Sequence, residues 1–228
     1  MLLSFSKVLK GDRKKIHKMI HDCIFSVLNK ISCLDSKILY TVRVENKISK
    51  EPKWISEVWI SDFDGENAEK ITDENHYSVH PVFFPDDPNF FAYISYKNGQ
   101  SKLYYRNFND SASSKLIPLR GNQLLPAFSK QGDMIAFISD AGGRPDLFLQ
   151  KLENKKPKGF PVQLFSYPRA TQASPTFSPD GKKIAFVSDK DGSPRIYMTE
   201  TGVKNKKRPA AELLTRKNRE NVTPSWSS

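Results

Sequence analysis

A sequence unit recurs along this chain with a nearly constant period. Its clearest copy spans residues 174–192 and reads SPTFSPDGKKIAFVSDKDG, and weaker copies occupy residues 125–143 and 80–99. A fourth copy begins at Thr223 and reaches the end of the sequence. Each copy carries an anchoring proline, and successive prolines are separated by 45, 49 and 49 residues: Pro81, Pro126, Pro175 and Pro224. A period of this size, with strands and tight turns in each unit, is typical of β-propeller blades.

The best copy shows what one unit encodes. Ser178–Gly181 (SPDG) combines the residues that favour a tight turn, and a short apolar run, Ile184–Ser188, follows it. An apolar run of this length between turns predicts a strand that is covered on both faces, as in the middle of a blade. Asp189–Gly192 carries an Asp-Gly hairpin signal. Arg195–Met198 and Ala211–Thr215 then supply the third and fourth strands.

The other units follow the same order. Ile135–Ser139 and Phe91–Ser95 are the equivalent apolar runs, whereas Lys37–Thr72 encodes only a second, third and fourth strand. We therefore expect an all-β fold, a β-propeller of four-stranded antiparallel blades preceded by one amphipathic helix. The expected division is an N-terminal helix in residues 1–35 and a propeller in residues 36–228. The propeller blades are expected at residues 37–72, 78–119, 123–165, 173–215 and 221–228.

These units are expected to form an open arc. With one strand from Thr223–Ser228 the chain encodes sixteen strands, enough for four blades. Closing four blades into a ring requires a sharper rotation between sheets than a six-bladed propeller uses. An open arc would expose the flanks of the first and last blades, including the run around Ile184–Val187 if no neighbour covers it, and such an apolar patch favours association.

The N-terminal segment predicts the helix. Apolar residues recur three or four positions apart between Ile16 and Ile31, which defines one stripe of an amphipathic helix. Asp12 is a suitable N-cap for this helix. The stripe needs a cover, which can be the propeller, a partner or, since the helix is basic, an anionic membrane surface.

The order of these parts resembles the TolB family, whose members carry WD40-like propeller repeats. The resemblance rests on the repeats and on the run from the helix into SKILYTV at Ser36–Val42, and it covers residues 12–228. It implies that the helix in residues 1–35 is the remnant of an α/β domain. It implies a non-catalytic, protein-binding scaffold of the periplasmic Tol–Pal system, which serves envelope integrity and protein import or translocation. The implied partners are a peptidoglycan-associated lipoprotein and an inner-membrane Tol component. No motif marks which residues bind them.

The two ends of the chain do not decide the cellular compartment of the protein. The segment MLLSFSKVLKGDRKK lacks the apolar core and cleavage site of a signal peptide, and the sequence contains no run that is long enough to cross a membrane. The resemblance implies the periplasm, whereas this start, if natural, implies the cytoplasm. Because the last repeat is interrupted, we expect a sequence truncated at both ends; a nonfunctional gene remnant is a further alternative.

The sequence identifies no catalytic, cofactor-binding or metal-binding residues. His17 and His21, like His76 and His80, are four residues apart, but a metal site needs a third or fourth ligand. Asp62–Gly65 and Asp189–Gly192 resemble calcium loops without the remaining ligand positions, and we interpret them as turns.

Hydrolase and nucleic-acid functions are also disfavoured. The sequence has no G-x-S-x-G elbow, and every histidine precedes residue 81. The alternative is therefore the regulatory propeller of a prolyl-oligopeptidase-like peptidase whose catalytic domain is absent. The net charge of +11 includes a basic cluster at Lys204–Arg208, with Arg216, Lys217 and Arg219 nearby. That cluster has no interleaved aromatic platform, so we interpret it as a solvated loop rather than a nucleic-acid site.

Overall fold

Four antiparallel sheets follow one another along the chain. The computed structural model describes residues 15, 16, 18, 20, 36–48, 52–202, 208–216 and 220–227. The first blade contains β1 (Lys37–Glu45), β2 (Trp54–Asp62) and β3 (Glu69–Lys70). The second contains β4 (Ser78–Phe84), β5 (Asp87–Ser95), β6 (Lys102–Asn107) and β7 (Ser114–Lys115). The third contains β8 (Gln123–Phe128), β9 (Met134–Ser139), β10 (Asp146–Glu153) and β11 (Lys156–Phe165). The fourth contains β12 (Gln172–Phe177), β13 (Lys183–Ser188), β14 (Arg195–Glu200) and β15 (Ala211–Leu213).

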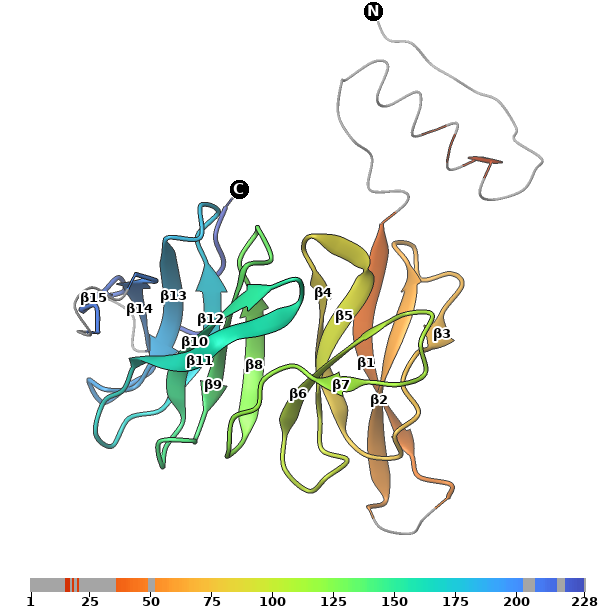
Figure 1. Ribbon diagram of the computed structural model, residues 1–228, viewed down its shortest axis with the longest axis horizontal. Coiled ribbons are helices and arrows are strands. Elements are labelled where there is room, and N and C mark those ends of the chain that lie inside the picture. Colours follow the sequence, from red (N-terminus) through yellow and green to blue (C-terminus); the bar gives the residue numbers. More distant parts are fainter. Residues whose placement is uncertain are drawn as a thin grey trace, which may run out of the picture.

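The sheets stand side by side in a row, with the first and fourth blades at opposite ends (Figure 1). This arrangement confirms the predicted open arc of propeller blades. The predicted helix lies mostly outside the described residues. Lys15, Ile16, Lys18 and Ile20 are helical, and the remainder of residues 1–35 is not described.

The apolar runs form the middle strands, as predicted. All five residues of each run, Phe91–Ser95, Ile135–Ser139 and Ile184–Ser188, are buried. Their side chains alternate between the two faces of a sheet, so a blade inside the row packs on the blade at each of its faces. One apolar cluster joins the second and third blades, and another joins the third and fourth.

Each first strand carries a bulge at the anchoring proline. The residue before the proline has a positive φ in every unit: His80 (51°), Leu125 (50°), Ser174 (47°) and Thr223 (53°). In β4, β8 and β12 the pairing register with the middle strand shifts at this point. A bulge tolerates proline because a ladder position there does not require an N–H donor. The repeated prolines are therefore explained by backbone geometry.

The last repeat keeps part of this geometry without forming a strand. Thr223 has the bulge conformation, and the Asn221 amide donates to Pro194 O at 2.8 Å. Equivalent bonds join Gln123 to Ser101 and Gln172 to Pro145. The predicted strand at Thr223–Ser228 is nevertheless wrong within residues 223–227, because none of the strands in the described part of the chain pairs with this segment.

The apolar run Ile184–Val187 is covered, so the condition for its exposure is not met. Ile184 and Phe186 are fully buried against the third blade, and Ala185 and Val187 on the other face of β13 are 4% and 6% exposed. Residues 220–227 lie against this blade, where the Trp226 indole donates to Thr176 O at 3.1 Å. The physical reason for association given above therefore does not apply to Ile184–Val187.

Candidate protein-binding surface

One edge of the row gathers the loops that connect blades. These are the loops after the middle strands (residues 96–101, 140–145 and 189–194) and the segments before the first strands (residues 73–77, 118–122 and 166–171). We call this edge the loop face, and it forms the lower edge of the row in Figure 1. Because adjacent loops are joined by the Gln123–Ser101 and Gln172–Pro145 backbone bonds, the face is continuous from blade to blade.

Aspartate carboxylates just after the middle strands hold these loops in place by accepting hydrogen bonds. Asp140 accepts from the Asn122 amide at 2.6 Å and from Asn122 Nδ2 at 2.7 Å. Asp189 occupies the equivalent position one repeat later and accepts from the Thr171 amide at 2.7 Å. The Asp189–Gly192 segment is thus a structural turn, as predicted, and Gly192 closes it with a φ of 91°.

Charged residues that the sequence analysis missed recur on the third strands and alternate in sign: Glu57, Lys102, Asp146 and Arg195. Lys102, Asp146 and Arg195 begin β6, β10 and β14, and each pairs with the serine that ends the apolar run of its blade. Glu57 lies within β2 and pairs with Val42 of β1. Burial lowers the pKa of Lys102, whose ammonium donates to Leu119 O at 2.8 Å. Burial raises the pKa of Asp146, which accepts from Gln163 Nε2 at 2.6 Å. The repeat spacing of these charges was the available signal.

A cationic cleft lies on the loop face between the third and fourth blades. Its volume is about 470 Å³, and Arg144 and Arg169 line it together with Gly142, Gly143 and Thr171. Arg144 Nε is 4.0 Å from the buried Asp146 carboxylate, and the Arg144 side chain is 41% exposed. Guanidinium groups bind carboxylates in a bidentate manner, so this cleft can accept acidic side chains of another protein.

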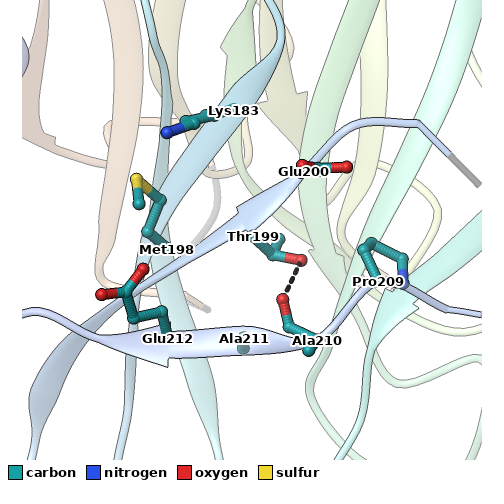
Figure 2. A pocket seen from close by; sticks show the side chains of 8 residues that line it. All are labelled: Lys183, Met198, Thr199, Glu200, Pro209, Ala210, Ala211 and Glu212. Carbon is teal, nitrogen blue, oxygen red and sulfur yellow. Dashed lines mark hydrogen bonds between the residues drawn. The ribbon is translucent and has the colours of Figure 1, made fainter.

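A second cleft, of about 430 Å³, lies on the fourth blade between β14 and β15. Figure 2 shows Lys183, Glu200 and Glu212 around it, and Thr199 Oγ1 donates to Ala210 O at 3.3 Å across its base. The lining mixes both charge signs with Met198 and alanine side chains. We assign no chemistry to it.

The first and second blades are joined by a buried acidic network. Glu57, 1% exposed, accepts from Thr72 Oγ1 and from the backbone amides of Glu74 and Asn75 at 3.1 and 3.0 Å. Glu74 in turn accepts from Tyr93 OH at 2.7 Å and from Lys97 Nζ at 2.8 Å. Glu74 lies in the segment that leads into the second blade, so its side chain connects the two blades.

Burial and hydrogen bonding act in opposite directions on these two glutamates. Burial raises the pKa of Glu57 above its usual range, and the hydrogen bonds from Thr72 and the backbone only partly offset this. Burial acts on Glu74 as well, but the bonds from Lys97, Ser95 and Tyr93 outweigh it and lower its pKa. For Glu57 the cost of burying the charged carboxylate therefore exceeds the stabilisation by its hydrogen bonds, whereas for Glu74 the hydrogen bonds and the Lys97 charge exceed that cost.

The remaining sequence candidates do not come together. His80 lies in the β4 bulge, His76 lies in the segment before β4, and His17 and His21 are outside the described residues. Gly65, with a φ of 85°, donates to Asp62 O at 2.9 Å, which makes Asp62–Gly65 a turn. Among the described residues, no cluster of three His, Cys, Asp or Glu side chains could hold a metal. None of the helices described here has the length and apolar character that crossing a membrane requires.

The successive blades and their bulged first strands define the chain as a β-propeller protein. A family model described as the TolB beta propeller domain matches residues 27–228, and the chain belongs to the TolB beta-propeller family. The TolB homolog of Protochlamydia amoebophila is 47% identical over 96% of this chain and 48% of that protein.

Two solved structures show the same fold. TolB from Acinetobacter baumannii is 22% identical with a TM-score of 0.68, over 90% of this chain and 48% of that one. A puromycin-hydrolyzing peptidase of Mycobacterium tuberculosis is 13% identical with a TM-score of 0.56, over 78% of this chain and 29% of that one. The chain therefore spans about half the length of the two TolB proteins.

Proposed function

We propose that this chain is part of a TolB-type scaffold that binds proteins of the Tol–Pal system in the periplasm and carries out no catalysis. The supporting observation is the family match over residues 27–228, together with a relative that is 47% identical. The proposed partners are a peptidoglycan-associated lipoprotein and an inner-membrane Tol component. Packed blades make such a scaffold rigid, so the propeller loses little conformational entropy when a partner binds.

The loop face is the proposed contact surface for the lipoprotein. It presents Arg144 and Arg169 around one cleft, with loops fastened by Asp140 and Asp189. Preorganised guanidinium groups favour a partner that offers carboxylates at the matching positions. The proposal therefore predicts binding that weakens as salt is added.

Binding to a purified peptidoglycan-associated lipoprotein tests this function. We expect a longer form of the protein that includes the upstream residues to bind it, and Arg144→Glu with Arg169→Glu to weaken binding by about tenfold or more. Isothermal titration calorimetry measures both. Lys182→Glu with Lys183→Glu is the matched control, because these exposed lysines lie at the turn between β12 and β13, away from the loop face.

The outcomes separate the two parts of the proposal. Binding that is unaffected by the arginine substitutions places the contact elsewhere on the propeller. Absence of binding by a folded protein contradicts the function and favours a regulatory propeller of a prolyl-oligopeptidase-like peptidase, or a gene remnant. The fold that the chain shares with the Mycobacterium tuberculosis peptidase supports the peptidase alternative. A downstream coding sequence for a G-x-S-x-G domain would establish this alternative.

A further inference from the structure

The outermost strand of the third blade differs from its counterparts. β11 is ten residues long, whereas the outer strands of the other blades, β3, β7 and β15, have two or three residues. Together with β10 it forms a long hairpin that crosses in front of the neighbouring strands toward the second blade (Figure 1). In the other blades an outer strand of two or three residues completes the sheet, so the blade fold does not by itself account for the length of this hairpin.

A bulge in β11 displays one aromatic side chain. Lys151 pairs with Lys158 and Leu149 with Val162, so Gly159, Phe160 and Pro161 together lie opposite Gln150. The Gln150 side chain is buried and donates through Nε2 to Lys158 O at 3.1 Å and to Gly159 O at 3.4 Å. Gly159 has a φ of 72°, which glycine adopts without strain. As a result Phe160 is 93% exposed.

The hairpin is held at its tip as well as at its bulge. Asn154 and Lys155 form the turn, both with positive φ. The Lys155 ammonium lies 3.1 Å from an Asp87 carboxylate oxygen and 4.8 Å from the centre of the Phe90 ring, both in the second blade. Because tip and bulge are both anchored, Phe160 projects from a preorganised backbone rather than from a loose loop.

Exposed lysines lie on the same hairpin as Phe160. The pairings of Glu153 with Lys156 and of Lys151 with Lys158 place these four side chains on one face of the hairpin. Lys151, Lys156 and Lys158 are exposed, and Val162 is 40% exposed. Glu153, the acid on this face, pairs with Lys158 at 2.7 Å. The exposed surface of the hairpin therefore combines an excess of positive charge with an apolar projection.

We propose that the exposed surface of this hairpin, formed by Lys151, Lys156, Lys158, Phe160 and Val162, docks on an anionic lipid surface. Phe160 enters the boundary between headgroups and acyl chains, and the three ammonium groups contact anionic headgroups. A side chain that is 93% exposed lies on a convex surface, which lipid accommodates without a preformed pocket. Addition of a strand from a protein partner is disfavoured, because Pro157 and Pro161 supply no N–H groups to the edge of β11.

Flotation with lipid vesicles tests the proposal on the full chain. We expect binding to vesicles of phosphatidylcholine mixed with phosphatidylglycerol, weaker binding to pure phosphatidylcholine, and a loss of binding as salt is added. Phe160→Ser is expected to weaken binding by about tenfold, because burial of a phenylalanine side chain is lost. Ile48→Ser is the matched control, since Ile48 is 78% exposed but lies in the β1–β2 hairpin of the first blade.

A charge-reversal variant with its control and a tryptophan variant test the role of the lysines and of Phe160 separately. Lys156→Glu with Lys158→Glu is expected to abolish the preference for anionic vesicles, whereas Lys182→Glu with Lys183→Glu leaves it intact. Phe160→Trp is expected to bind like the unchanged chain and to shift its added tryptophan emission to shorter wavelength on anionic vesicles. Equal binding of Phe160→Ser and the unchanged chain overturns the proposal and points to the basic segment in residues 1–35. A folded chain that binds neither kind of vesicle overturns it in favour of a protein partner.

Discussion

Phe186→Ala is expected to lower the free energy of unfolding by about 3–5 kcal/mol, the usual result of truncating a buried phenylalanine. Phe186 is fully buried in β13, and its ring centre lies 4.9 Å from that of Phe165 and 6.0 Å from that of Tyr197. It belongs to the cluster that joins the third and fourth blades, so the cavity opens between sheets that are held by their own hydrogen bonds. Phe137 has the same position in the third blade and the same expected loss.

Urea denaturation of the folded chain measures this loss, and Phe160→Ala supplies a control with identical chemistry. Phe160 is 93% exposed, so its truncation removes little buried surface and is expected to change the free energy of unfolding by less than about 0.5 kcal/mol. A loss below about 1 kcal/mol for Phe186→Ala would mean that the blades do not pack as described.

The strands were predictable because each is encoded locally. A turn of Ser178–Gly181 type, an apolar run and an Asp-Gly turn lie within twenty residues, and the same order recurs in each unit. The sequence analysis recognised the prolines as markers of the period. Their place in a bulge, after a residue with positive φ, could be recognised only from the pairing of the strands in the structure. The domain division at residue 36 and the identity of the binding residues stay predictions.

Features that depend on contacts between blades or strands were missed. β11 contains two prolines and a glycine, so its sequence does not read as a ten-residue strand, and its pairing with β10 and the buried Gln150 stabilise it. Whether Ile184–Val187 is covered stayed open in the sequence analysis because a local pattern does not show what packs on a strand; the run is buried. The network of Glu57, Glu74 and Lys97 spans two blades; the repeat spacing marks Glu57 as one of the recurring charges but does not indicate its bonds to the segment of Glu74 or the bond from Lys97 to Glu74.

Substitution of the two glutamates in this network is expected to give opposite dependences on pH. The folded-state pKa of Glu74 is lowered from 4.5, so its contribution to stability is present above that value and is lost as pH falls through the folded pKa. The folded-state pKa of Glu57 is raised from 4.5, so its contribution is full below that value and is lost as pH rises through the folded pKa. Glu74→Gln should therefore destabilise more at neutral pH than at acidic pH, and Glu57→Gln should do the reverse.

Denaturation of both variants and the unchanged chain across the acidic range measures these two slopes. At neutral pH we expect Glu74→Gln to cost about 2–3 kcal/mol, because the Lys97 ammonium loses a charged partner while its side chain remains 27% exposed. Glu57→Gln keeps an acceptor for the amides of Glu74 and Asn75 and removes the penalty for ionising a buried carboxyl, so its cost at neutral pH is about 1 kcal/mol or less. Parallel slopes for the two variants would contradict the assignment of opposite pKa shifts to these side chains. Lys97→Met is the complementary test, since it leaves Glu74 charged without its partner and should reproduce the loss at neutral pH while moving the acid-side decline to higher pH.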